Sequence, residues 1–558
     1  MESDTSDETL DRRTLLSGTT SLLAAGSIGS ILADRGVATP TATEPTQRPA
    51  PVSATTTSEE LFPQSIASGG PTPSGVLCWT RLDPIQYAGG PVALQIAPTP
   101  SFERLVYERS IPATEIGPAT DHTITVDCTG ALASNTEYAY RFVADGVASN
   151  TGRCRTLPAT DAQIERLSFA VATCQDYQNG YFGAFSHIAA EDVDFLLHLG
   201  DFIYEAADGR FAGSEFDDRE LSLPSGNDVA HTLSDFRYLY RQYRSDRHLQ
   251  RALEQHTLIA CWDDHEIAND RYWDDSTDSP RLPDHPQGMQ PDAATQITAD
   301  GIQAWIEMLP VRVTYEPNPT HPDLQNAFRL QHTLSFGSLV TLVLTDERLY
   351  RDPPPGIGES DTPGRSMLGD DQRSWFLNAI EEHSTTWTVW ANEVLSMPLT
   401  LGPTDIGSVL NGDAWDGYQH ERDILTNAFA DVDNLVTLTG DIHTAMAGYQ
   451  QRGDDFYEDR TPVGVEFVAP AITSKNLSEV VPTHDGLTTS DISEPAVKLA
   501  NPHVEFFDSS IWGYAVVEFT PNGCSYTVYS VDKHASEDPA KTERIHLRVP
   551  AGDVQIER

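Results

Sequence analysis

The sequence predicts a two-domain α/β protein in which a small β-sandwich precedes a larger layered domain. Three observations lead to this prediction. Residues 61–158 hold short apolar runs between Gly, Pro and Asn signals, the pattern of a sandwich, and strand-like runs alternate with helical segments from residue 159 onward. The 558 residues also exceed the roughly 250–300 at which a single hydrophobic core stops growing.

Residues 1–34 are predicted to be an export signal of the twin-arginine (Tat) type. Arg12 and Arg13 precede a weakly apolar stretch rich in Gly, Ala and Ser, with a cleavage position near Ala33. The alternative is a membrane anchor, although polar interruptions make the stretch a poor permanent span. We therefore expect transient contact with the Tat machinery and a secreted, extracellular or cell-envelope location. Residues 35–60, rich in Pro, Thr and Ala, are predicted to be a disordered linker.

The small domain covers residues 61–158, with Trp79, Tyr138 and Tyr140 as core aromatics or, alternatively, as a binding surface. The large domain covers 159–535, and 536–558 are predicted to be a C-terminal tail. Within the large domain, helices are expected at 179–192, after a cap at Ser234, at 370–383 and at 419–432. Residues 205–232 and 274–300 are polar and rich in acids, which predicts loops at the rim.

The net charge is −47, with 83 acidic against 36 basic residues, of which only four are lysines. Acid-rich, lysine-poor surfaces resemble those of halophilic proteins, in which salt screens the self-repulsion. An acidic tail is the alternative, but the acids are spread along the whole chain. The negative surface also argues against specific nucleic-acid binding. Six cysteines are too few for a disulfide scaffold of this size, although Cys128 and Cys154 either pair outside the cell or stay reduced.

Five buried strand-like runs each stop on a side chain that can bind a metal. The run ends are Cys174, Asp201, Asp264, Asn392 and Asp441. Ligands collect outside the carboxyl ends of strands in α/β sheets, because the connecting loops diverge there. Donors of this kind, delivered from many strand ends, are typical of a multi-metal hydrolytic centre. The sequence thus predicts a metal-dependent phosphoesterase.

Three short motifs carry the chemistry. In GDFIYE, Tyr204 follows Asp201 closely enough to face the same ion, although many Gly-Asp pairs simply turn the chain. In WDDHEIAND, a metal role is assigned to Asp264, and His265 is the proton donor or transition-state stabiliser. In LTGDIH, Asp441 and His443 stand two apart on an extended backbone, so both side chains point to one face.

The chain resembles the PhoD-type alkaline phosphatases and phosphodiesterases, within the calcineurin-like metallophosphoesterases. The resemblance covers residues 61 to 530 and includes CQDYQNGYF, HLGDFIYE, WDDHEIAND, TDERLYRDPPP, WDGYQHER, GDIHTAM and NPHVEF in order. It implies a metallophosphoesterase domain with a pair of β-sheets flanked by helices, preceded by a fibronectin-like sandwich. It also implies Fe³⁺ and Ca²⁺ as the metals.

The expected metal ligands form two sets. Cys174, Tyr204, His443 and Asp201 mix thiolate, phenolate, imidazole and carboxylate, which suits a transition metal. Asp264, Asp441, Asn392 and bridging Asp201 offer oxygen only, which suits Ca²⁺. The wider superfamily commonly has Asp at the first position and His at the fourth, where this chain has Cys174 and Asn392.

The expected reaction is the hydrolysis of phosphate mono- and/or diesters by attack of a metal-bound hydroxide. His265 protonates or stabilises the leaving alkoxide, and Arg348 and Arg351 neutralise phosphoryl charge or, alternatively, form surface ion pairs. The phosphate ester is the expected partner of a monomeric enzyme. Two alternatives stay open: a phospholipase-like diesterase with little monoesterase activity, and a non-catalytic surface protein with a degenerate metallophosphatase fold.

Overall fold

The protein is described by a computed structural model. It covers residues 56–212, 216, 218–316, 323–356, 359, 361–382, 384–401, 412–452, 461–480 and 492–558. The predicted signal at 1–34 and nearly all of the predicted linker lie outside the described residues. Among the described helices, none combines the length and hydropathy needed to cross a membrane.

Two large β-sheets form the centre of the molecule. The first has nine strands in the order β25 (Lys541–Pro550), β24 (Gly523–Val531), β23 (Gly513–Thr520), β9 (Leu167–Ala172), β10 (Phe195–Leu199), β11 (Thr257–Cys261), β1 (Ile66–Thr72), β2 (Gly75–Arg81) and β5 (Thr123–Asp127). The second has seven strands in the order β16 (His332–Phe336), β17 (Val340–Leu344), β18 (Trp387–Asn392), β19 (Leu435–Thr439), β21 (Thr461–Val468), β20 (Ala445–Arg452) and β22 (Val504–Asp508).

Aromatic side chains join the facing surfaces of these two sheets. Phe169 of β9 packs edge-on against Phe336 of β16, and Trp387 of β18 packs on Phe519 of β23. All four are fully buried. Strands β9, β10 and β11 run parallel, as do β17, β18, β19 and β21, and such strands are buried on both faces and read as continuous apolar runs. Their carboxyl ends therefore lie at one end of each sheet.

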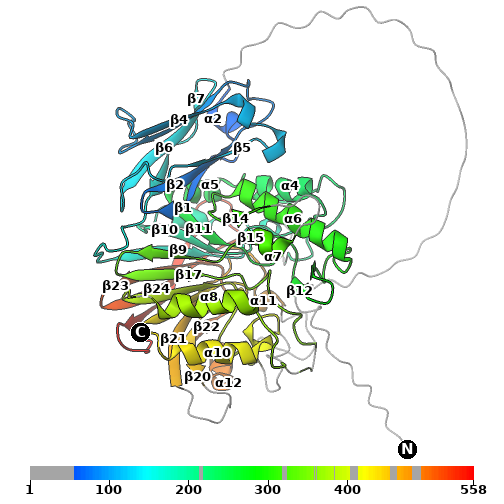
Figure 1. Ribbon diagram of the computed structural model, residues 1–558, viewed down its shortest axis with the longest axis vertical. Coiled ribbons are helices and arrows are strands. Elements are labelled where there is room, and N and C mark those ends of the chain that lie inside the picture. Colours follow the sequence, from blue (N-terminus) through cyan, green and yellow to red (C-terminus); the bar gives the residue numbers. More distant parts are fainter. Residues whose placement is uncertain are drawn as a thin grey trace, which may run out of the picture.

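Helices cover the outer faces of both sheets (Figure 1). Beside the nine-stranded sheet lie α3 (Ala184–Ile188), α4 (Leu233–Tyr243), α5 (Arg247–Gln255) and α6 (Pro291–Met308). Over the seven-stranded sheet lie α8 (Gly369–Glu381), α10 (Gln419–Phe429) and α12 (Glu494–Ala500). Shorter helices are α2 (Ser58–Leu61), α7 (Leu324–Ala327) and α11 (Leu477–Val480), and two small hairpins are β12 (Tyr272–Asp274) with β13 (Ser279–Arg281) and β14 (Thr314–Tyr315) with β15 (Phe328–Arg329).

Helix boundaries follow capping chemistry. Helix α4 begins after Thr232, whose side chain forms a reciprocal capping box with Asp235, so the predicted cap at Ser234 is wrong by two residues. The predicted loop over 274–300 is wrong for residues 291–300, because Pro291 starts α6. The first buried residues of that helix include small ones such as Ala294. Its sequence therefore shows too little apolar periodicity to indicate a helix.

The N-terminal unit is a two-layered β-structure, as predicted, but one of its layers belongs to the nine-stranded sheet. Its second layer consists of β4 (Tyr107–Ile111), β3 (Val92–Ala97), β6 (Glu137–Ala144), β7 (Val147–Ala148) and β8 (Gly152–Arg155). Strand β1 pairs in parallel with β11, with Gly69 opposite Leu258. Tyr138 and Tyr140 lie in the core between the layers. Trp79 is also buried, but it packs under Arg244 of the large domain, 3.5 Å from its ring.

The predicted C-terminal tail is largely a strand. Residues 541–550 form β25, which pairs antiparallel with β24 along its whole length. Leu547 and Val549 are buried, whereas the residues between and before them are mostly exposed. This one-sided pattern of an edge strand contains too few apolar residues to stand out in the sequence.

His198 of β10 provides a stability prediction. It is fully buried, Nδ1 has no hydrogen-bond partner among the described residues, and burial lowers its pKa to about 3. In the unfolded chain this histidine binds a proton near pH 6.5, whereas in the native state it stays neutral. The free energy of unfolding therefore decreases as the pH is lowered from about 6.5 to about 3. When the pH is lowered from 7 to 5, the free energy of unfolding measured with urea should decrease by about 2 kcal/mol less in His198→Gln than in wild type. Equal losses in both proteins would contradict a neutral buried imidazole.

Candidate functional site

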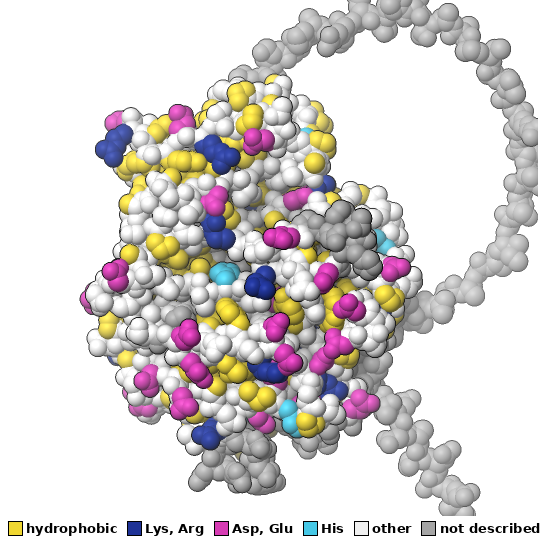
Figure 2. All heavy atoms as spheres, in the orientation of Figure 1, with side chains coloured by type: hydrophobic (Ala, Val, Ile, Leu, Met, Phe, Trp, Pro, Cys, Tyr) yellow, Lys and Arg dark blue, Asp and Glu magenta, His cyan; other side chains and the backbone are white. Residues whose placement is uncertain are grey.

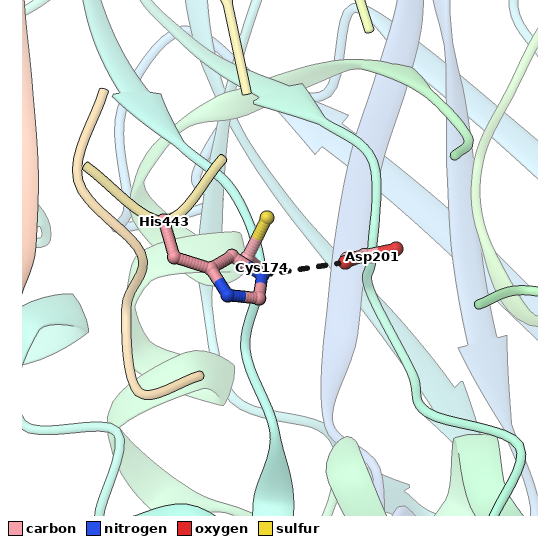
Figure 3. Close-up of side chains that lie close together, drawn as sticks. All are labelled: Cys174, Asp201 and His443. Carbon is pink, nitrogen blue, oxygen red and sulfur yellow. Dashed lines mark ion pairs between the residues drawn. The ribbon is translucent and has the colours of Figure 1, made fainter. Parts of the chain in front are cut away.

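Four of the predicted ligands converge where β9, β10, β11 and β19 end. Ligand atoms of Cys174, Asp201 and His443 all lie within 4.8 Å of one another, and so do those of Asp201, Asp264 and His265. Figure 3 shows Cys174, Asp201 and His443 facing one another, with His443 Nε2 3.9 Å from Asp201 Oδ2. Asp201 belongs to both groups, which is the arrangement expected of a carboxylate shared between two cations.

The backbone at this site is held in an uncommon conformation. Cys174, Asp201, Asp441 and His443 have φ values of 55°, 57°, 62° and 54°, in the left-handed region. Each such residue costs on the order of 1–3 kcal/mol, and residues of this kind cluster at functional sites.

Tyr204 completes the first group. Its hydroxyl donates to Asp201 Oδ2 at 2.8 Å, lies 3.2 Å from His443 Nε2, and accepts a 2.6 Å bond from Ser474 Oγ. His443 Nδ1 lies 2.6 Å from the carbonyl of Lys475. A proton on Nδ1 satisfies that carbonyl and leaves Nε2 as the ligand atom, the usual second contact of a metal-binding histidine.

The chemistry of this group fits a cation. Burial and the neighbouring Asp201 raise the pKa of both the Cys174 thiol and the Tyr204 phenol well above their ordinary values. A positive ion among the donors reverses this balance, because it favours the deprotonated thiolate and phenolate. Thiolate, phenolate, imidazole and carboxylate together suit a transition metal. The side chains present therefore fit the ion that the motifs predict.

His265 is held by a residue that the sequence analysis missed. Its Nδ1 lies 2.7 Å from Glu205 Oε2, and its ring stacks on Tyr204 with centroids 4.0 Å apart. Burial opposes a charge on His265, but Glu205, Asp201 and Asp264 outweigh it and raise the pKa well above its ordinary value. Glu205 directly follows Tyr204 in GDFIYE, and this adjacency was the available signal.

Arg348 lies beside two members of the predicted oxygen-only group, Asp264 and Asp441. The fully buried guanidinium contacts Asp263, lies 2.8 Å from Asp441 Oδ1 and 3.6 Å from Asp264 Oδ2. Burial disfavours a charge on Asp264, but Arg348 and His265 outweigh this effect and hold the pKa of Asp264 below its ordinary value. The structure thus brings Asp264 and Asp441 together around a fixed positive charge. The alternative of a surface ion pair is wrong for this arginine.

Asn392 lies at the end of β18, and its side-chain amide is hydrogen-bonded at both ends. Its amide nitrogen donates to Val394 and to Thr439 Oγ1, and its carbonyl accepts from Trp415 Nε1 at 3.2 Å. Side chains alternate along β18, so Asn392 shares the helix-covered face with Trp390, whereas Ala391 faces the other sheet. The role of Asn392 as a metal ligand stays a prediction.

Arg351 is buried beside the same site and is likewise not a surface residue. Its Nε donates to the carbonyl of Arg271 at 2.8 Å and its Nη1 to that of Asp413 at 2.5 Å. Within the described part of the chain, its Nη2 has no hydrogen-bond partner. One N–H group of this arginine is therefore open to an anion.

Comparisons with known proteins identify the family of this chain. Residues 169–528 match the model of the PhoD-like phosphatase family, and residues 46–158 match that of the PhoD-like phosphatase N-terminal domain. Alkaline phosphatase D of Bacillus subtilis (strain 168) is 31% identical over 480 residues, which are 83% of this chain and 76% of the relative. A solved structure described as the structure of PhoD aligns with a TM-score of 0.75 and 26% identity, over 90% of this chain and 93% of its own. The chain therefore belongs to the PhoD-like phosphatase family and is a hydrolase of phosphoric ester bonds.

Proposed function

We propose that the chain hydrolyses phosphate monoesters and diesters at the centre formed by Cys174, Asp201, Tyr204 and His443. The observation that carries this proposal is the convergence of a thiol, a phenol and an imidazole around the Asp201 carboxylate. The name of the relative, an alkaline phosphatase, supports activity on monoesters. The diesterase with little monoesterase activity is the result to be distinguished by experiment.

The proposed metals are Fe³⁺ and Ca²⁺. Cys174, Tyr204, His443 and Asp201 would hold the iron, and Asp201, Asp264 and Asp441 would hold calcium. When bound, these cations lower the pKa of a water molecule and neutralise phosphoryl charge. Carboxylate oxygens are the ligands that calcium prefers, whereas thiolate and phenolate favour iron over calcium.

The protein's own side chains would handle the proton and the charge of the phosphoryl group. His265 donates a proton to the leaving alkoxide, and Glu205 fixes the ring by accepting from Nδ1. Arg351 offers its unpartnered Nη2 to a phosphoryl oxygen. Arg348 keeps Asp264 and Asp441 in place and adds positive charge beside them.

Metal analysis combined with two substrates tests this proposal. Purified protein should contain iron and at least an equal amount of calcium, and ferric phenolate or thiolate coordination should absorb visible light. It should hydrolyse both p-nitrophenyl phosphate and bis-p-nitrophenyl phosphate. Turnover of the diester alone would favour the diesterase alternative. A colourless, iron-free enzyme with full activity would overturn the assigned iron site.

We further propose that the protein is a monomer exported by the Tat pathway. The support is the twin arginine ahead of a weakly apolar segment. Replacing Arg12 and Arg13 by Lys should retain the enzyme inside the cell, with activity measured in the cell and outside it. Undiminished export of this double variant would exclude the pathway.

Salt adaptation is the last part of the proposal and makes a prediction. Figure 2 shows Asp and Glu scattered over the visible face with few Lys and Arg between them. The Debye length falls from about 10 Å at 0.1 M to about 3 Å at 1 M, so salt should weaken repulsion among these exposed charges. The unfolding temperature should therefore rise between 0.1 M and 1 M NaCl and KCl alike. A flat or falling curve would contradict salt adaptation.

A further inference from the structure

Glu266 directly follows His265 but takes no part in the proposed reaction. Its side chain is fully buried at the carboxyl ends of β10 and β11. Oε1 accepts a hydrogen bond from the backbone N–H of Phe202 at 2.7 Å, and Oε2 accepts from those of Asp201 at 3.2 Å and Asp263 at 2.8 Å. One carboxylate therefore joins the loops that follow two neighbouring parallel strands.

The two loops approach each other closely where Glu266 joins them. A Cβ atom at Gly200 would lie 2.5 Å from the Cβ of Asp263 and 2.7 Å from its backbone nitrogen, so a larger residue does not fit there. Gly200 and Asp201 also have positive φ values of 92° and 57°. The residues of this tight turn are buried, and a buried N–H group without an acceptor costs free energy. Glu266 supplies the acceptor for three such groups.

The backbone of Asp201 is held from two sides. Its N–H donates to Glu266, and its carbonyl accepts the N–H of Gln175 at 3.1 Å. Gln175 directly follows Cys174, a proposed iron ligand, in the loop after β9. Glu266 belongs instead to the loop after β11, which carries Asp264. The Gln175 bond therefore ties Asp201 to the iron side of the centre, and the Glu266 bond ties it to the calcium side.

We infer that Glu266 is a positioning residue that fixes Asp201 relative to Asp264, and through them the calcium position. Ligand atoms of Asp201 and Asp264 lie within 4.8 Å of each other. The inference rests on the proposed function, in which these two carboxylates and Asp441 hold calcium. Glu266 acts through the backbone, because both of its oxygens are used by N–H groups. A residue of this kind changes metal affinity without contacting the metal.

Glu266→Gln tests the inference in the full-length, iron-loaded protein. The amide keeps the size of the side chain but replaces one acceptor oxygen by an NH₂ group, which would face a backbone N–H as donor to donor. The dissociation constant of calcium, measured by equilibrium dialysis, should rise about 10–100-fold. The iron content should stay near wild type, because the Gln175 bond and the iron donors are unchanged. Unchanged calcium affinity, or a parallel loss of iron, would overturn the inference.

Added calcium separates a positioning role from a general loss of structure. Weaker binding can be overcome by concentration, so excess calcium should restore most of the p-nitrophenyl phosphate hydrolysis of Glu266→Gln. A variant that stays inactive at every calcium concentration would contradict the positioning role. Wild type that binds no calcium would remove the proposed calcium site and the inference together. Calcium binding by wild type and an equally tight variant would remove the inference alone.

Hydrogen exchange provides a readout that does not depend on activity. The peptide that contains Asp201 and Phe202 should exchange its amide protons faster in Glu266→Gln than in wild type, because these N–H groups lose their acceptor. Equal exchange in both proteins would show that the carboxylate does not hold this loop. Glu266→Asp keeps the charge but is one methylene shorter and cannot reach both loops. It should lose calcium in the same way, and it decides the question if the Gln variant does not fold.

The matched control is a second buried glutamate that binds a loop through its backbone. Glu421 of α10 is 1% exposed and accepts the N–H groups of Met367 and Leu368. Glu421→Gln should speed exchange at residues 367–368 and leave calcium affinity and exchange at residues 201–202 at wild-type values. Weaker calcium binding in this control as well would reveal a general effect of removing a buried carboxylate and would overturn the inference.

Discussion

Replacing Asp201 by Asn is expected to lower kcat/KM for p-nitrophenyl phosphate by more than about 100-fold. Loss of a residue that merely orients a metal ligand costs about 10–100-fold, so loss of a carboxylate shared by both donor groups should cost more. Asp201 also accepts the bond from Tyr204 and lies near His443. Iron content and visible absorbance should therefore fall together with activity.

The matched control lies at the opposite end of the same strand. Asp194 immediately precedes β10, bonds the backbone N–H of Ser168 at 2.9 Å and pairs with Arg155. Asp194→Asn should leave kcat/KM and iron content near wild type. Circular dichroism should show both variants folded, because Asp201 sits among like charges and its neutralisation relieves repulsion. Retained turnover and iron in Asp201→Asn would remove the shared-ligand role.

Replacing Glu205 by Gln should lower kcat by about 10–100-fold and affect poor leaving groups most. Glu205 stabilises the protonated ring of His265, so its loss lowers the pKa of that histidine. A proton donor with a lowered pKa is lost at lower pH, and the alkaline limb of the kcat profile should move towards acid. The measurement is the pH profile of hydrolysis for an alkyl phosphate and for p-nitrophenyl phosphate.

The leaving group separates proton donation from a structural defect. p-Nitrophenolate departs without much help, whereas an alkoxide needs the proton, so the alkyl ester should suffer more in Glu205→Gln and in His265→Asn. Glu254→Gln is the control, because Glu254 is a buried glutamate that bonds Ser65 and Asn150 away from the site. Equal losses for both esters would show that Glu205 does not act through proton transfer.

The positions of most site residues could be predicted because buried parallel strands can be recognised in the sequence as continuous apolar runs. Runs such as that before Asp201 are apolar on both faces, and the first polar donor after each run marks the strand end. The order of these ends predicted that Cys174, Asp201 and Asp441 meet, and the structure brings Cys174 and Asp201 into one group and places Asp441 beside Arg348.

Three features could not be predicted in the same way. Strand β18 has one face towards Trp415 and one face towards the other sheet, and its register decides on which of them Asn392 lies. The position of Arg348 among four carboxylates depends on tertiary packing, because these carboxylates come from segments far apart in the sequence. The pairing of β1 with β11 joins segments almost two hundred residues apart, and neither strand carries a mark of its partner.

The pairing of β1 with β11 has a consequence for any shortened version of the protein. Strand β11 leads directly into Asp263 and Asp264, and its outer neighbour is supplied by the N-terminal unit. A chain starting at residue 159 would leave the backbone groups on that side of β11 unpaired, and a bare apolar strand of this kind templates aggregation. The large domain is thus expected to be insoluble by itself, because the N-terminal unit shields the edge of β11.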